Sequence, residues 1–240
     1  MEDLITEVKK KSELSGVPNS LIIDLINDHR KKHPFSFPLK KKDQKLIVKE
    51  IRSQLRDYVG RFKKKKSPSL LSSHTSTNER ESFYKELKEI IYSSSPHSIL
   101  DIGCGLNPIA LAKPGVKYFA SDIDEQNLKE VQKFFDISGI EGKTFIADAR
   151  KDPFPQSDLT LIFKVLDIIE IKGHKKAEDL LLRLKSPRIL VSFSTRKLSG
   201  KPMNRPQRYW FEKMLSRLNF PYSKFSFHNE IFYDIRKELQ

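Results

Sequence analysis

One stretch of the chain decides its fold: Ile99-Leu100-Asp101-Ile102-Gly103-Cys104-Gly105-Leu106-Asn107-Pro108. An apolar strand enters a glycine turn and continues into a helix whose first turn holds a proline. The two glycines let the backbone approach a ligand closely, and the start of the helix offers free N–H groups. We therefore predict a cofactor-binding loop between a strand and a helix.

Two classes of cofactor use such a loop. A dinucleotide site has the pattern G-x-G-x-x-G, in which the third glycine lets helix and strand pack closely. The residue at that position here is Pro108. Asp101, before the first glycine, would repel a pyrophosphate but can receive the ammonium of a methionine-like tail. The loop therefore favours S-adenosylmethionine, which has that ammonium and no phosphate.

Further acidic residues follow at the ends of the next two predicted strands. Asp122 lies about 20 residues after the loop, where a carboxylate can accept hydrogen bonds from both ribose hydroxyls. Asp148 ends the third strand and can accept from an adenine amino group. Asp124 is expected to cap the following helix. In register with the glycine loop, Asp101, Asp122 and Asp148 predict one coherent cofactor site.

Strand and helix patterns alternate around the loop. The predicted strands are 98–102, 117–121, 144–147, 159–163 and 189–193, and the helices between them include 126–135 and 177–185. This alternation predicts a parallel sheet covered by helices. A helix over 210–218 and a hairpin over 224–228 and 230–235 follow. We therefore predict a class I methyltransferase fold, a Rossmann-like α/β structure whose mostly parallel sheet ends in an antiparallel hairpin.

The first 75 residues carry a different pattern. Apolar residues at helical spacing predict two helices, one capped by Asn19 or Ser20 and the other by Asp43. Two prolines between them forbid a continuous helix, and the four adjacent lysines at 63–66 mark a boundary or a phosphate-contacting loop. The predicted domains are a basic helical domain over residues 1–75 and a Rossmann-like methyltransferase domain over residues 76–240.

The net charge of +14 is concentrated in the helical domain. Residues 1–75 hold 18 Lys and Arg against 9 Asp and Glu, so most of the excess lies in less than a third of the chain. A basic lobe favours a polyanion, nucleic acid first, and the alternative is a solubilising lysine surface. The single cysteine, Cys104, indicates a reducing cytoplasm. We find neither a membrane-spanning apolar run nor a signal peptide.

Two segments carry a resemblance to a known family. They are residues 73–80, Ser-His-Thr-Ser-Thr-Asn-Glu-Arg, and the glycine loop at 98–108; further matches lie at 163–166, 191–193, 198–201 and 209–212. From about residue 70 onward the chain resembles the aminoglycoside-resistance 16S rRNA methyltransferases, the Arm/Rmt group. Those enzymes methylate guanine N7 in the decoding site of the small ribosomal subunit. The helical domain resembles their rRNA-docking domain in size, charge and helicity.

The resemblance implies roles for two residues outside the glycine loop. Arg80 would pair with the carboxylate of the cofactor, and Lys164 would lie beside the cofactor or the target base. No general base is expected, because guanine N7 carries a lone pair and no proton at neutral pH, so positioning suffices. The predicted cofactor site comprises Arg80, Asp101, Gly103, Cys104, Gly105, Asn107, Asp122, Ile123, Asp148, Ala149 and Lys164.

Contacts with RNA are predicted at other positions. The target base is expected to be flipped out of its helix, with Tyr209, Trp210 and Phe193 as candidates to stack on it. The alternative for Trp210 and Phe211 is the core face of a helix. The residues predicted to hold phosphates are Lys63, Lys64, Lys65, Lys66, Arg196, Lys197, Lys201, Arg205 and Arg208.

The resemblance thus implies a cytoplasmic S-adenosylmethionine-dependent rRNA (guanine-N7)-methyltransferase that acts on 16S rRNA in the 30S subunit and confers aminoglycoside resistance. Two alternatives remain open. One is a methyltransferase for another RNA position or for a small molecule, and the other is a catalytically inert ribosome-assembly factor with this fold. The intact glycine loop and its acidic residues argue against the inert factor, because the fold alone does not impose them. We expect a monomer without a metal or a membrane contact.

Overall fold

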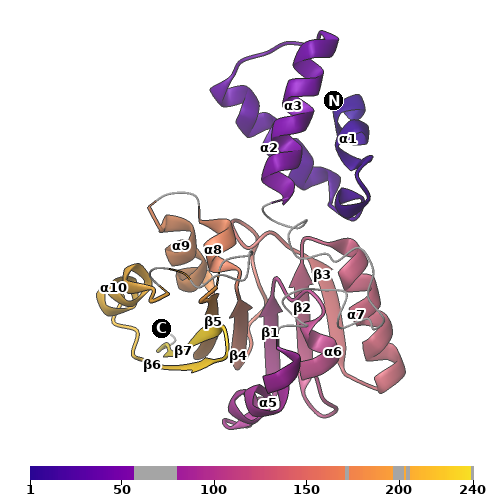
Figure 1. Ribbon diagram of the computed structural model, residues 1–240. Coiled ribbons are helices and arrows are strands. Elements are labelled where there is room, and N and C mark those ends of the chain that lie inside the picture. Colours follow the sequence, from indigo (N-terminus) through magenta and orange to yellow (C-terminus); the bar gives the residue numbers. More distant parts are fainter. Residues whose placement is uncertain (57–79, 171–172, 197–202, 204–205, 239–240) are drawn as a thin grey trace.

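A computed structural model describes residues 1–56, 80–170, 173–196, 203 and 206–238 (Figure 1). In these residues seven strands form one sheet in the order β3-β2-β1-β4-β5-β7-β6. The strands are β1 (Ser98–Ile102), β2 (Lys117–Asp122), β3 (Gly142–Ile146), β4 (Leu159–Phe163), β5 (Arg188–Ser194), β6 (Tyr222–Phe227) and β7 (Glu230–Arg236). β1 to β5 are parallel, and β7 inserts antiparallel between β5 and β6. This sheet confirms the predicted class I methyltransferase fold.

The strand bounds agree with the sequence pattern where a glycine or a charged residue directly follows a mostly apolar run. β1 and β4 have the predicted bounds. β3 begins at Gly142, two residues before the predicted start at Thr144. A Cβ atom at Gly142 would lie 2.2 Å from the ring of Phe135, so only glycine fits beneath this side chain. Because glycine is unfavourable in strands, the sequence pattern missed this start.

Helices cover both faces of the sheet (Figure 1). The helices α5 (Tyr84–Tyr92), α6 (Asn107–Leu111) and α7 (Glu125–Ser138) share one hydrophobic cluster with one face. The helices α8 (Leu166–Ile169), α9 (Lys175–Arg183) and α10 (Tyr209–Arg217) share a second cluster with the other. Successive residues of β1, such as Ile99 and Leu100, belong to opposite clusters. Among the described helices, none combines the length and the apolar character needed to cross a membrane.

The N-terminal residues form a separate helical module with its own core. Its elements are α1 (Glu2–Lys9), η1 (Ser12–Leu14), α2 (Asn19–Lys32) and α3 (Lys41–Leu55). Leu4, Ile22 and Ile51 are fully buried between these helices. The described part of the chain stops at residue 56 and resumes at residue 80, so the proposed domain boundary at 75/76 lies outside the described residues.

The predicted caps of α2 and α3 were wrong. Pro18 and Lys40 hold the N-cap positions, and neither helix has a side-chain cap. Asn19 and Asp43 instead lie inside the first helical turn. A carboxylate there still interacts favourably with the helix dipole, which explains why Asp43 marks the right region and the wrong position. The predicted cap at Asp124 is confirmed, since its side chain accepts a hydrogen bond from the Gln126 N–H at 3.0 Å.

The helical module lies against the carboxyl end of the parallel strands (Figure 1). The Glu125 N–H donates to the Gly16 carbonyl oxygen at 3.1 Å, directly after β2. Ile123 packs against the core of the module. A Cβ atom at Gly16 would lie 2.6 Å from Asp124 Oδ1, so a larger residue here would displace the side chain that caps α7. The module is therefore fixed beside the edge where the predicted cofactor residues lie.

Candidate cofactor site and basic groove

The predicted cofactor residues gather where the order of the sheet reverses. The chain proceeds from β1 to β2 and β3 on one side, and β4 and β5 lie on the other side of β1. In open α/β sheets, ligands bind outside the carboxyl ends of the strands at such a switch point. The glycine loop leaves β1 at this point, and Lys164 directly follows β4.

Both glycines of the loop are required by the backbone. Gly103 and Gly105 have φ angles of 63° and 51°, in the left-handed region that favours glycine. A Cβ atom at Gly103 would also lie 2.5 Å from Val165 Cγ2. The Cys104 N–H donates to the Ser121 carbonyl oxygen at 2.9 Å, and the buried Cys104 side chain belongs to the core. β2 therefore holds the loop in place.

Asp101 is fully buried beneath the glycine loop. Its Oδ2 accepts a hydrogen bond from the Tyr118 hydroxyl at 3.0 Å, whereas Oδ1 is buried without a partner among the described residues. Burial raises the pKa of Asp101 to about 7, although Tyr118 and the Arg80 charge act in the opposite direction. A buried polar atom without a partner is costly, and a ligand ammonium would supply the missing contact. The site therefore fits S-adenosylmethionine.

Asp122 supports the loop from the end of β2. Its Oδ2 accepts from the Gly105 N–H at 2.8 Å and its Oδ1 from the Asp124 N–H at 2.9 Å. Burial raises the pKa of Asp122 to about 6 against the opposing effect of these N–H groups. Each carboxylate oxygen has a second lone pair, so the carboxylate can bind the loop and a ribose together. The ribose contact stays a prediction.

Asp148 is paired with a neighbouring guanidinium. Arg150 Nε lies 2.9 Å from Asp148 Oδ1, and Arg150 Nη2 lies 2.6 Å from Oδ2. Burial alone would raise the pKa of Asp148, but the hydrogen bonds and charge of Arg150 outweigh it and hold the pKa below its usual value. Asp148 is thus a carboxylate at neutral pH, and its contact with adenine stays a prediction. Ala149 is buried in the core on the α9 side.

Arg80 is fully buried and already faces a carboxylate of the protein. Its Nη2 lies 2.7 Å from Glu230 Oε1, and its Nε lies 3.1 Å from both Glu230 oxygens. Its Nη1 donates to Asn107 Oδ1 at 2.9 Å, and the guanidinium lies 4.9 Å from the centre of the Phe163 ring. The sequence predicted Arg80 and Asn107 at the cofactor, and the structure brings them to each other. Pairing of Arg80 with the cofactor carboxylate stays a prediction.

Glu230, at the start of β7, is the residue that sequence reasoning missed. It is fully buried and contacts Arg80, Ser192 Oγ and Lys164 Nζ, the last at 3.2 Å. Burial would raise the pKa of Glu230, but the charges of Arg80 and Lys164 hold it below its usual value. The signal available in the sequence was a charged residue directly before the apolar run 231–233. A charge buried beside such a run requires a partner of opposite charge.

Lys164 has an unusual backbone conformation. Its φ angle is 61°, in the left-handed region that non-glycine residues seldom adopt. The Lys164 N–H donates to the Ser192 carbonyl oxygen at 3.0 Å, which ties the turn after β4 to β5. Strained backbone of this kind occurs at ligand sites when the surrounding structure holds it. Lys164 lies at the switch point, and its contact with the cofactor or the target base stays a prediction.

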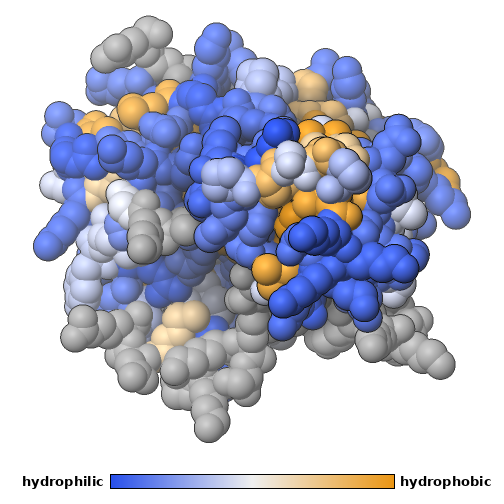
Figure 2. All heavy atoms as spheres, turned by 90° about the horizontal axis from the view of Figure 1, so that it is seen from above, coloured by the Kyte–Doolittle hydropathy of each residue, from blue (hydrophilic) through white to orange (hydrophobic). Residues whose placement is uncertain are grey.

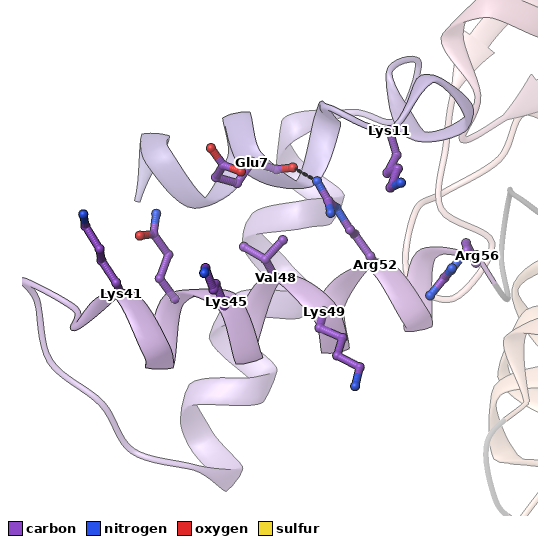
Figure 3. A pocket seen from close by; sticks show the side chains of 9 residues that line it. Glu7, Lys11, Lys41, Lys45, Val48, Lys49, Arg52 and Arg56 are labelled. Carbon is purple, nitrogen blue, oxygen red and sulfur yellow. Dashed lines mark hydrogen bonds between the residues drawn. The ribbon is translucent and has the colours of Figure 1, made fainter.

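A basic groove lies on the helical module, between α1 and α3. It has a volume of about 440 Å³, and Figure 3 shows the side chains that line it. The cations that line it are Lys11, Lys41, Lys45, Lys49, Arg52 and Arg56. Arg52 also donates hydrogen bonds to the backbone carbonyls of Glu7 and Val8, so it joins α3 to the end of α1. The sequence analysis missed this groove, although cations three or four residues apart predict one face of a helix.

The two predicted phosphate contacts that the structure describes, Arg196 and Arg208, lie in different surroundings. Arg196 is exposed. Arg208 is buried, with Nη2 lying 2.7 Å from Asp167 Oδ2 and its guanidinium 5.2 Å from the centre of the Phe193 ring. The structure therefore places Arg208 inside the fold rather than on an RNA-facing surface. The calls at Lys63, Lys64, Lys65, Lys66, Lys197, Lys201 and Arg205 lie outside the described residues.

The aromatic residues proposed to stack on a flipped base divide in the same way. Phe193 is fully buried in the core, so its proposed stacking role was wrong. Trp210 stacks on His174, with ring centres 4.0 Å apart, and Tyr209 is 60% exposed. Phe211 is fully buried, which confirms the core alternative for that residue.

The fold and the glycine-loop site together define the class: an S-adenosylmethionine-dependent methyltransferase. The family profile for ribosomal RNA methyltransferase (FmrO) matches residues 63–233. This match covers more than half of the chain, and the chain belongs to that family.

Relatives of known name agree with this family. A Frankia casuarinae protein named 16S rRNA (guanine(1405)-N(7))-methyltransferase is 29% identical over 174 residues, which cover 68% of this chain and 61% of that protein. A Serratia marcescens protein of the same name is 37% identical over 152 residues, which cover 59% of each chain. The chain thus spans about three fifths of the length of these curated relatives.

Solved structures share the whole arrangement. The 16S rRNA methylase RmtB superposes with a TM-score of 0.77 at 26% identity, covering 99% of this chain and 98% of its own. The 16S rRNA methyltransferase RmtF, solved in complex with S-adenosyl-L-homocysteine, superposes with a TM-score of 0.79 at 21% identity and the same coverage, and so shares the fold.

Proposed function

We propose that this chain transfers a methyl group from S-adenosylmethionine to N7 of a guanine in the decoding-site region of 16S rRNA within the 30S subunit, in the cytoplasm, and thereby confers aminoglycoside resistance. One observation carries the proposal. A buried carboxylate oxygen of Asp101, without a described partner, lies beneath a glycine loop at the switch point of a ribosomal RNA methyltransferase family member.

The chain's own residues bind and orient the cofactor in this proposal. Asp101 receives the ammonium, and the Tyr118 hydroxyl holds the carboxylate in place through Oδ2. Gly103 and Gly105 let the backbone approach the cofactor, and Asp122 receives the ribose hydroxyls while it holds the loop. When bound, S-adenosylmethionine would supply an electrophilic methyl group attached to its sulfonium sulfur. The N7 lone pair would form the new bond to this methyl group, and the cofactor would leave as a neutral thioether.

No residue has to remove a proton, because guanine N7 carries none. Because the methyl donor would bring a positive charge and the methylated purine would keep it, the site needs no strong field to stabilise a new charge. Holding N7 in line with the methyl group and the sulfur is then the main catalytic effect. Lys164, at the end of β4, borders the place where the target base would enter.

The basic groove supports RNA as the substrate. Its cations can neutralise phosphates of a folded RNA, and hydrophilic residues cover most of the face seen from the module's side (Figure 2). The contact between Gly16 and Glu125 fixes the module beside the cofactor loop. A groove held at a fixed position relative to the cofactor would set which base of a bound RNA reaches the methyl group.

A methyl-transfer assay with labelled S-adenosylmethionine tests the proposal. The substrates are 30S subunits, naked 16S rRNA, total tRNA and no RNA, and Asp101→Asn serves as the cofactor-site variant. Borohydride–aniline treatment, which cuts RNA at 7-methylguanosine, maps the product. We expect label on 30S subunits, cleavage in the decoding-site helix, and aminoglycoside tolerance in cells that express the wild-type chain.

Other outcomes contradict specific parts of the proposal. Label without aniline cleavage would move the target to another atom. Label on tRNA alone would move the target to another RNA. Cofactor binding without transfer to any of these RNAs would exclude the rRNA substrate and leave the small-molecule or assembly alternative.

A further inference from the structure

Two histidines and a glutamate meet on the helical module, away from the glycine loop and outside the basic groove. His29 lies in the last turn of α2, His33 follows that helix, and Glu50 lies on α3. Their ligand atoms all lie within 4.8 Å of one another. The His33 N–H donates to the His29 carbonyl oxygen at 2.8 Å, so the helical path continues to His33 and places both imidazoles on one side.

The distance between two of these groups matches metal ligation. His29 Nδ1 lies 3.3 Å from Glu50 Oε2. Two ligand atoms bound at tetrahedral positions of one Zn²⁺ are about 3.4 Å apart, given metal–ligand distances near 2.1 Å. Two imidazoles and a carboxylate form a donor set that zinc accepts, with the fourth position open to water.

A second observation indicates a missing ligand at the same place. His29 is 6% exposed, and its Nδ1 forms no hydrogen bond despite its closeness to Glu50. A buried polar atom without a partner is costly. The Phe35 ring, 6.1 Å from the His29 ring, adds to the cover of this imidazole. A bound cation would satisfy Nδ1 and pair with Glu50 at once.

We propose that His29, His33 and Glu50 bind one divalent cation of the zinc class, with water as the remaining ligand. The cation joins the C-terminal end of α2, the negative end of its dipole, to the middle of α3. It therefore holds the segment between the two helices, which contains two prolines, in one arrangement. Because α3 also carries four cations of the basic groove, Lys41, Lys45, Lys49 and Arg52, the metal would stabilise the module that presents this groove. The sequence analysis expected no metal.

Metal binding can be measured without any methyl-transfer assay. Zn²⁺ is titrated into tag-free, metal-stripped full-length protein by calorimetry, and Co²⁺ serves as a spectroscopic probe. The variants are His33→Gln, which changes an exposed residue, and Glu50→Gln, whose side chain is 44% exposed, so both should fold. The matched control is His97→Gln, because His97 is 98% exposed and lies far along the chain.

We expect one equivalent of Zn²⁺ to bind the wild-type chain and the His97→Gln control alike. Each ligand variant should bind at least about 100-fold more weakly, the upper end of what loss of an outer metal-site partner costs. Zn²⁺ should raise the Tm of the wild-type chain and not that of His33→Gln. Co²⁺ should give a visible d–d spectrum without thiolate charge transfer, since the single cysteine is buried elsewhere.

Three results would overturn the metal site. One is the absence of a stoichiometric Zn²⁺ equivalent in the wild-type chain. Another is unchanged affinity in both His33→Gln and Glu50→Gln, which would assign the binding to other residues. The third is a thiolate charge-transfer band with Co²⁺, which would place the ion on Cys104.

Discussion

The cluster around Glu230 and the basic groove between α1 and α3 both gather charge, but they do so in opposite ways. In the cluster, Arg80 and Glu230 are fully buried and bind each other directly. In the groove, Lys41, Lys45 and Lys49 are exposed to water. Burial makes each charge depend on its partner, whereas exposed charges act at longer range and together. The cluster should therefore respond to single substitutions, and the groove to the number of cations and to salt.

Removing the anion of the cluster should have the largest effect. Glu230→Ala leaves the Arg80 guanidinium buried without its counter-charge, and loss of one partner from a buried pair costs about 3–5 kcal/mol of unfolding free energy. Urea unfolding measures this loss. The matched control is Glu178→Ala, which breaks a bidentate pair with the exposed Arg217 and should cost far less.

A double variant sharpens the same test. Arg80→Met combined with Glu230→Leu removes both charges of the ion pair. This double variant should lose less unfolding free energy than Glu230→Ala alone. Equal losses for Glu230→Ala and Glu178→Ala would contradict the view that burial sets the cost in the cluster.

Asp101→Asn should separate cofactor binding from stability. The amide retains an oxygen for the Tyr118 hydroxyl but cannot pair with an ammonium, so affinity for S-adenosylmethionine should fall by about 2–5 kcal/mol, roughly 30- to several-thousand-fold. Calorimetric titration measures this loss. A variant that binds the cofactor as tightly as the wild type would remove Asp101 from the site.

Stability should change in the opposite direction. The folded protein holds the proton of Asp101 up to a pKa of about 7, whereas the unfolded chain releases it near 3.8. The carboxyl group therefore weakens the fold progressively as the pH rises from about 4 to 7. Asp101→Asn removes this effect and should raise the unfolding free energy at about pH 8 by up to ~4 kcal/mol.

The same pKa predicts how cofactor affinity depends on pH. Binding requires the Asp101 carboxylate and a protonated ligand amine, so the affinity should fall up to about tenfold for each pH unit below about 7, and should fall again above about pH 8 as the amine loses its proton. Asp122, with a pKa of about 6, should steepen the fall at lower pH. Calorimetry in buffers of different ionisation enthalpy should detect proton release on binding near pH 6. Asp101→Asn should lose the step near pH 7.

The sequence predicted the parts of the site that are local in the chain. Asp101, Gly103 and Gly105 lie within five residues, and the two glycines allow the positive φ angles that the turn requires. β1 and β4 were predicted with correct bounds because each is a mostly apolar run that ends directly before Gly103 or Lys164.

Contacts between distant segments were not predictable in this way. Arg80 and Glu230 are 150 residues apart, and no periodic pattern shows that the hairpin strand β7 returns beside β5 with its first residue facing Arg80. Arg208 was predicted to hold an RNA phosphate, but it is buried and pairs with Asp167 of α8. Which charged residues are buried can therefore be predicted only when the residues that pair with them are known.

The groove should give the smallest effect per residue and the clearest dependence on salt. The double variant Lys45→Gln/Lys49→Gln should weaken binding to 30S subunits by roughly fivefold per lysine at physiological salt. Each lost phosphate contact lowers the number of counterions that are released when the RNA binds. The slope of log Kd against log salt should fall by about one per lysine. Lys133→Gln, which changes an exposed lysine on α7, is the matched control.

Filter-binding titrations over a range of salt concentrations measure both the affinity and the slope, and the cofactor affinity and the Tm should stay unchanged. If Lys133→Gln changed the slope as much as one groove substitution does, the net charge of the protein rather than the groove would govern RNA binding.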